Sequence, residues 1–272
     1  MHATGAPEAT STLPNLSRHR PSVQLVAEGL ARDGRHWSNT GVPGAYASKM
    51  DSAVAFVARL LRERGFRRQR HVFNAEAEPG LTQVLTFQMG AHPPPGTSGV
   101  PGLRENLYGA FTINLGLHFD EVRDVPLRTP RPAFLREVDL PPARPRPKFL
   151  RDGDCHVTTR LGQLIGEDDV WWKLDLADDD LQALVQQLVG DYALPFFERF
   201  RSRRAVVDAW HARDPAVRYT PRVTIAVIHA RLGEAAEAAE LLDSELRETE
   251  RPVTRQAILQ AAAHLGLDIA DN

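Results

Sequence analysis

The stretch FTINLGLHF (residues 111–119) decides the fold, because apolar and polar residues alternate along it without interruption. Successive side chains of an extended strand point to opposite sides, so the apolar residues share one side and Thr112, Asn114 and His118 share the other. This period predicts a β-strand with one apolar face and one polar face.

Two further segments show the same alternation. Residues 81–89 carry Thr82, Thr86 and Gln88 between apolar residues, and residues 155–161 carry His156, Thr158 and Arg160 in the same way. If the three segments are neighbours, their polar side chains emerge together. We therefore predict an α+β fold, with a mostly antiparallel sheet, helices on its apolar face and an uncovered polar face.

The remaining elements follow from helical periodicity, turn residues and composition. A helix is predicted at Ser52–Arg64, with strands at 66–73 and 170–174, a turn at 74–80, and helices at 181–189 and 196–210. Residues 90–104 and 120–153, rich in proline, are predicted loops. Residues 1–49 lack periodicity and form a predicted disordered extension, and Met50 is an alternative start of the chain.

The C-terminal part, residues 216–272, is predicted to be helical and to follow an α+β domain at 50–212. Its segment HARLGEAAEAAELL (residues 229–242) resembles one helix–turn–helix unit of a tetratricopeptide-type repeat. Helices are predicted at 223–231, 234–246 and 253–265. A single unit of this kind does not bury its own apolar face, so we expect it to pack on the α+β domain.

Composition narrows the classes of function. The formal net charge is −2, which provides no global field for nucleic acid, and no apolar run approaches the length of a membrane span. The chain has one cysteine, Cys155, and its N-terminus lacks a signal-like apolar run. We expect a cytoplasmic protein with no membrane partner and no cofactor.

No catalytic motif is present, so chemistry must be sought in single residues. His118 and His156 come close if their strands are adjacent, and Asp120 or Asp154 is a possible third ligand, but two histidines alone do not form a zinc site. Cys155 and His156 are adjacent on a predicted strand and therefore face opposite sides. We predict no metal and no catalytic residue.

Binding residues are easier to propose. The candidates are the polar-face residues, one tryptophan that could stack a ligand, and two arginines from the basic run at 59–70: Asn114, His118, His156, Arg160, Trp172, Arg67 and Arg68. If the arginines at 62, 67, 68 and 70 formed a stripe with those of the 120–151 loop, nucleic acid would become a candidate partner.

Five separated blocks resemble DUF4304, a bacterial family of unknown function. They are RGFRRQRHVF (64–73), FTINLGLHF (111–119), DCHVTTRLG (154–162), WWKL (171–174) and YALPFFE (192–198). The resemblance extends over about residues 50–212 and implies an α+β fold, but it implies no activity. The loops at 90–104 and 120–153 are longer than in the family pattern.

From the sequence we expect a non-enzymatic protein-binding factor that uses the polar sheet face, with toxin neutralisation (an immunity-like role) as one possible form. The alternative is a hydrolase or nucleic-acid-processing enzyme built around His118, His156 and Arg160. Convergence of these three side chains in a concave pocket would favour the enzyme. Another protein is the expected partner, ahead of nucleic acid.

Overall fold

A computed structural model describes residues 43–91, 107–125, 147–167 and 169–269, which belong to one compact unit. The predicted disordered extension lies outside these residues up to position 42, and so do most of the two predicted loops. Helix α2 spans Pro43–Glu63 and thus begins nine residues before the predicted Ser52.

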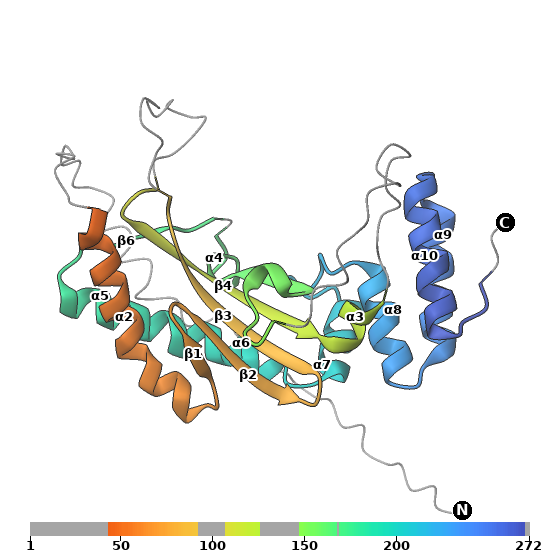
Figure 1. The fold of residues 1–272 in the computed structure, drawn as a ribbon, viewed down its shortest axis with the longest axis horizontal. Coiled ribbons are helices and arrows are strands. Elements are labelled where there is room, and N and C mark those ends of the chain that lie inside the picture. Colours follow the sequence, from red (N-terminus) through yellow and green to blue (C-terminus); the bar gives the residue numbers. More distant parts are fainter. Residues whose placement is uncertain (1–42, 92–106, 126–146, 168, 270–272) are drawn as a thin grey trace, which may run out of the picture. The chain divides into compact units, whose positions relative to one another are not determined.

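The sheet follows the predicted alternation (Figure 1). Its described strands are β1 (Arg67–Gln69), β2 (Val72–Glu78), β3 (Leu81–Met89), β4 (Ala110–Phe119), β5 (Val157–Arg160) and β6 (Trp172–Lys173). The strand order is β1-β2-β3-β4-β5, with β6 beside β4 at its other end, and every pair is antiparallel. The predicted α+β architecture with an antiparallel sheet is therefore confirmed.

One part of the sheet differs from the prediction. The segment 66–73, expected to be a single strand, is a hairpin in which β1 and β2 are joined by Arg70 and His71. Arg70 has a φ of 55°, which reverses the chain. The predicted turn at 74–80 is mostly strand β2, and the actual turn is Pro79–Gly80, where Gly80 has a φ of 80°.

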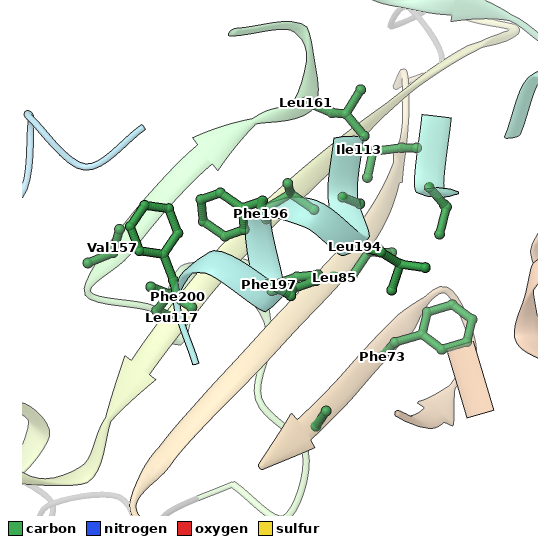
Figure 2. Packing of buried hydrophobic residues seen from close by; sticks show 14 of the residues in the cluster. Phe73, Leu85, Ile113, Leu117, Val157, Leu161, Leu194, Phe196, Phe197 and Phe200 are labelled. Carbon is green, nitrogen blue, oxygen red and sulfur yellow. The ribbon is translucent and has the colours of Figure 1, made fainter. Parts of the chain in front are cut away.

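Helices cover the apolar face of the sheet. Helix α5 (Asp178–Leu188) continues through a π-helical turn, η4 (Val189–Ala193), into α6 (Leu194–Arg199). The aromatic side chains of this stretch pack against β3, β4 and β5, as Figure 2 shows for Phe196, Phe197 and Phe200. Apolar burial of this kind supplies most of the stability of such a layer.

The predicted helix at 196–210 is broken into two. Phe200 leaves helical geometry (φ −104°, ψ 48°), and α7 (Arg203–His211) begins after Ser202, whose hydroxyl accepts the N–H of Ala205. Arg203 is buried and donates to Glu121 of α3 (Asp120–Asp124) at 2.6 and 2.9 Å. It also donates to Glu78 at 2.8 Å, so one guanidinium ties α7 to the sheet and to α3.

Three C-terminal helices match their predicted bounds to within two residues: α8 (Arg222–Arg231), α9 (Ala235–Glu248) and α10 (Pro252–Leu265). Ile225, Val227 and Ile228 of α8 belong to the same apolar core as the sheet. The C-terminal helices thus pack on the α+β part, as expected for a single helical unit. Within the residues described, none of the helices combines the length and apolarity required to cross a bilayer.

Candidate functional site

The strand register brings the predicted polar side chains onto one face. Thr82 pairs with His118, Thr86 with Asn114, and Asn114 in turn with Arg160. The face that carries these residues, together with Asn74 of β2 and Gly116 of β4, is called the polar face below. Alternation predicted the residues of this face that lie on β3, β4 and β5, because the register keeps these three strands in phase, but it did not predict Asn74, which was expected in a turn.

The expectation that this face is uncovered is wrong. Residues 147–156, here called the covering segment, cross it and are hydrogen bonded to it. Asn114 donates to the carboxylate of Asp152 at 2.9 Å, within the short 3-10 helix η3 (Asp152–Asp154). Asn114 is only 8% exposed and His118 only 1%. Asn114 and His118 of β4 therefore bind the protein's own chain, which satisfies buried donors that would otherwise be costly.

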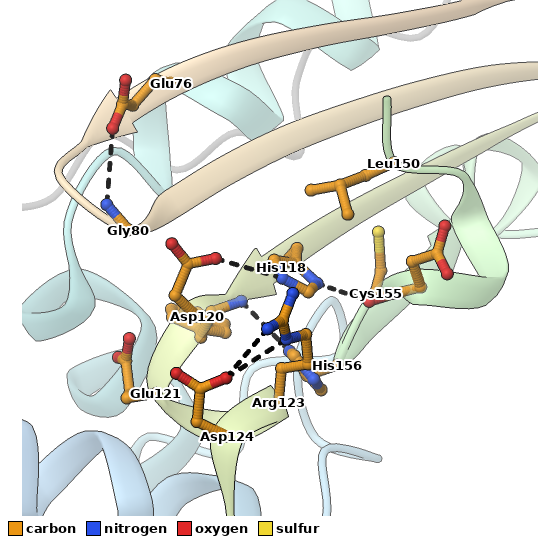
Figure 3. A network of polar contacts seen from close by, with 12 residues as sticks. Glu76, Gly80, His118, Asp120, Glu121, Arg123, Asp124, Leu150, Cys155 and His156 are labelled. Atoms are coloured by element: carbon orange, nitrogen blue, oxygen red, sulfur yellow. Dashed lines mark hydrogen bonds and ion pairs between the residues drawn. The ribbon is translucent and has the colours of Figure 1, made fainter. Parts of the chain in front are cut away.

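His118 and His156 do come together (Figure 3). Their rings lie next to each other with centroids 4.8 Å apart and planes tilted by 30°. His118 Nδ1 donates to the backbone carbonyl of Asp154 at 2.6 Å, and its Nε2 lies 3.4 Å from Oδ1 of Asp120. His156 Nδ1 accepts the N–H of Phe119 at 3.1 Å. The pair joins β4 to the end of the covering segment.

The pKa of His156 is lowered to about 4, first because burial disfavours the charged ring and then because His118 lies beside it. Glu121 and Asp154 oppose this shift without cancelling it. His156 is therefore neutral at physiological pH. Among the described residues, no cluster of three or more histidine, cysteine or carboxylate side chains is arranged to hold a metal.

Cys155 lies on a different side from the one predicted. Strand β5 begins only at Val157, so the alternation does not extend back to Cys155. Its Sγ lies over Gly116 on the polar face, where a Cβ on Gly116 would stand 2.4 Å from it, and the thiol donates to the carbonyl of Arg151 at 3.4 Å. Burial raises the pKa of the thiol, and Asp152 and Asp154 add to this effect. The thiolate nucleophile is thereby suppressed.

The other two candidates of this region are separated by the sheet. Arg160 forms an ion pair with Asp169 and lies over the ring of Trp171 at 5.5 Å. Trp172, the tryptophan selected from the sequence, is 9% exposed and packs against Phe111 in the apolar core. It therefore does not share a surface with Arg160. Adjacent strand residues face opposite sides, and here Trp172 is the tryptophan that faces the apolar core.

Arg67 and Arg68 line a cavity of about 970 Å³ beside the covering segment. Its other cationic residues were not selected from the sequence: Arg123 of α3, and Lys148 and Arg151 of the covering segment. These five residues define the basic groove. The sequence shows that the 120–153 stretch is rich in arginine. It does not show that part of this stretch lies next to β1.

Among the cations of the basic groove, Arg123 pairs with Asp124 at 3.2 Å, whereas the other four form no ion pair with a described residue. Arg67, Lys148 and Arg151 form no ion pair with any described residue, and Arg68 donates to the backbone carbonyl of Arg70 at 2.7 Å. Many other arginines are paired, including Arg160 with Asp169, Arg199 with Asp214, Arg203 with Glu121, and Arg222 with Glu248. Positive charge without internal compensation attracts anionic groups.

A smaller cavity of about 270 Å³ adjoins the groove and shares Arg67, Pro147 and Lys148 with it. Asn74, Glu76, Thr82 and Leu150 complete its lining. The groove thus continues toward the polar face between β2 and the covering segment, and a carboxylate stands at this inner end. Its surface is not uniformly basic.

Comparison with known proteins gives one match. No curated protein and no solved structure matches the chain. A family model matches a segment of the chain. This segment starts at residue 103, before β4, and ends at the last residue of α6, so it includes the covering segment but not Arg67 or Arg68. It is shorter than the resemblance at 50–212. Residues 103–199 match the family model DUF4304, described as a domain of unknown function, and the chain resembles that family over this segment.

Proposed function

We propose that this is a non-enzymatic binding protein whose basic groove takes an acidic segment of another protein. The observation that carries the proposal is the gathering of Arg67, Lys148 and Arg151, none of which has an acidic partner among the described residues, around one cavity of about 970 Å³. A volume of this order accommodates a short segment with several side chains. We place this binding in the bacterial cytoplasm, where toxin neutralisation would be one instance of it.

An acidic protein segment suits the groove better than nucleic acid does. Nucleic-acid backbones are tracked by continuous basic surfaces, whereas Asp154 lines the groove itself and Glu76 lines its inner end. Phe149 and Pro147 add apolar surface to the lining, which favours a segment that carries apolar as well as acidic side chains.

The enzymatic alternative rests on the adjacent rings of His118 and His156. Its weakness is access, because His118 is 1% exposed and both rings are occupied by contacts with β4 and the covering segment. A histidine with a pKa of about 4 is also a weak general base at neutral pH. Arg160 is paired with Asp169 and does not converge on the two rings.

The proposal is tested by charge reversal in the groove. The double variant Arg67→Glu/Arg151→Glu is compared with Arg231→Glu/Arg251→Glu, which makes the same change in net charge at exposed sites of α8 and just before α10. Fluorescence anisotropy at low ionic strength follows a labelled oligoglutamate peptide, an oligolysine peptide and single-stranded oligodeoxythymidine.

We expect oligoglutamate to bind the wild type and the control variant, and to bind the groove variant at least about tenfold more weakly, since two attractive contacts become repulsive. Equal binding by all three proteins would refute the groove as the site. Tighter binding of oligodeoxythymidine than of oligoglutamate, lost on the same reversal, would refute the protein partner in favour of nucleic acid.

A further inference from the structure

The basic groove is assembled from two separate parts of the chain. Arg67 and Arg68 belong to β1, whereas Lys148 and Arg151 belong to the covering segment, about 80 residues later. Strand β1 is held in place by its pairing with β2. The covering segment forms no strand of the sheet between residues 147 and 156, so its position is fixed by side chains, apart from the backbone hydrogen bond at its end from the N–H of His156 to the carbonyl of Leu117.

Asn74 is the closest point of attachment to the groove. Its amide oxygen accepts the N–H of Leu150 at 2.8 Å, and its amide nitrogen donates to the carbonyl of the same residue at 3.0 Å. Both partners are buried, with Asn74 4% and Leu150 2% exposed. A primary amide is one of the few side chains that satisfies a backbone donor and acceptor at once.

The position of Asn74 in the strand register places it next to both parts of the basic groove. Asn74 pairs with Arg67 across the β1–β2 hairpin, and its side chain holds Leu150, which lies between Lys148 and Arg151 in the chain. One residue therefore connects the two walls of the groove. Asn74 also lines the smaller cavity, together with Arg67 and Lys148.

We infer that Asn74 is a positioning residue of the basic groove, which sets the spacing between Arg67 and the cations of the covering segment. The inference rests on the proposed function for its ligand, but the placement of the segment is testable without any ligand. Asn114 and His118 secure the segment further along, through Asp152 and Asp154. Their role is then to shape a neighbouring binding surface, without forming one themselves.

The test compares Asn74→Ala with Gln83→Ala. Gln83 is a matched control: it is a buried amide, 5% exposed, on the opposite face of the same sheet, and it donates to the carbonyl of Phe197 at 2.6 Å. Both substitutions remove buried hydrogen bonds and should lower the free energy of unfolding similarly. Only Asn74→Ala should release the covering segment.

Release is measured at Cys155, the single cysteine of the chain, which lies on the covering segment. We expect its alkylation by iodoacetamide under native conditions to be at least about tenfold faster in Asn74→Ala, because local opening exposes the thiol, and unchanged in Gln83→Ala. Equal rates in Asn74→Ala and wild type would overturn the inference, whatever the groove binds.

Binding adds a second readout, through double-mutant cycles with the oligoglutamate probe. In the Asn74→Ala background, Lys148→Ala/Arg151→Ala should cost little further affinity, whereas Arg67→Ala should cost as much as it does in the wild type. Full additivity of the Lys148→Ala/Arg151→Ala cost would overturn the positioning role. If wild type does not bind the probe, the proposed function fails, while the alkylation result still decides whether Asn74 places the segment.

Should Asn74→Ala fail to fold, Asn74→Ser takes its place, because a serine side chain is too short to reach both backbone atoms of Leu150. The same faster alkylation is expected. A rate equal to that of wild type would again overturn the inference.

Discussion

The two faces of the sheet are both covered over strand β4, but by different means. On the apolar face, side chains from α2, α5, α6 and α7 fill the space over the strands, and contact depends on shape and volume. On the polar face, ten residues of the chain are fastened by hydrogen bonds to Asn74, Asn114 and His118. Every residue of β4 is buried as a result. Apolar packing holds the fold together as a whole, whereas the polar attachments fix one segment in place.

The largest effect should come from opening the apolar face. Phe200 is fully buried, and its ring lies 4.9 Å from that of Phe196. We expect Phe200→Ala to lower the free energy of unfolding by about 3–5 kcal/mol, since it removes apolar contact and leaves a cavity. Urea denaturation measures the change. A loss below about 1 kcal/mol would show that the two faces do not differ as described.

Lowering the pH should weaken the polar face through His156. Its pKa in the folded protein is about 4, against 6.5 for an ordinary histidine, so the unfolded chain takes up a proton first as the pH falls. The stabilisation is complete above pH 6.5 and is lost as the pH falls toward 4, with a total of about 3 kcal/mol.

This pH dependence is measured as the free energy of unfolding of wild type and of His156→Gln between pH 7 and pH 4. The wild type should lose more stability than the variant over this range. His264→Gln, at an exposed site near the end of α10, serves as the control and should retain the wild-type slope. Parallel curves for wild type and His156→Gln would contradict the neutral, buried state of this ring.

A smaller effect is expected where the covering segment approaches β4 most closely. A Cβ on Gly116 would stand 2.4 Å from Sγ and 2.7 Å from Cβ of Cys155, so Gly116→Ala must displace the segment. We expect a loss of about 1–3 kcal/mol by urea denaturation. The same substitution in a Cys155→Gly background should cost clearly less. An equal cost in both backgrounds would mean that the strain arises elsewhere.

The smallest effect on the free energy of unfolding is expected at Thr158, which lies at the edge of the region that the covering segment covers. Thr158 pairs with Gly116 across β4 and β5, yet it is exposed. Thr158→Val should change the free energy of unfolding by less than about 0.5 kcal/mol. A loss above about 1 kcal/mol, measured by the same denaturation, would indicate that Thr158 makes a contact with the segment.

The sequence was sufficient for strands β3 and β4 and for the side on which their polar residues lie. Alternation in residues 81–89 and 111–119 predicted both strands, and it also predicted that His118 and His156 lie on one side. The C-terminal helices were equally predictable, because their apolar spacing is regular and glycine separates α8 from α9. Local periodicity carries this information directly.

The covering segment was not predictable in this way. A polar strand face is compatible with water, with a partner or with another part of the chain, and alternation does not distinguish these cases. Residues 147–156 have no period of their own, and Asn74 belongs to a stretch with asparagine, proline and glycine that is typical of a turn. The composition of the basic groove depends on where this segment lies. Of its cationic residues, only Arg67 and Arg68 were therefore among the binding residues predicted from the sequence.

The attachment at Leu150 has a consequence for how the groove could be altered. Asn74 holds main-chain atoms, which every amino acid at position 150 except proline would supply. The route of the segment is thereby uncoupled from the identity of its neighbours at 148 and 151. Substitutions at these two positions should redirect ligand preference while the scaffold stays intact, which makes this short stretch a natural place to randomise in a library selected for new specificities.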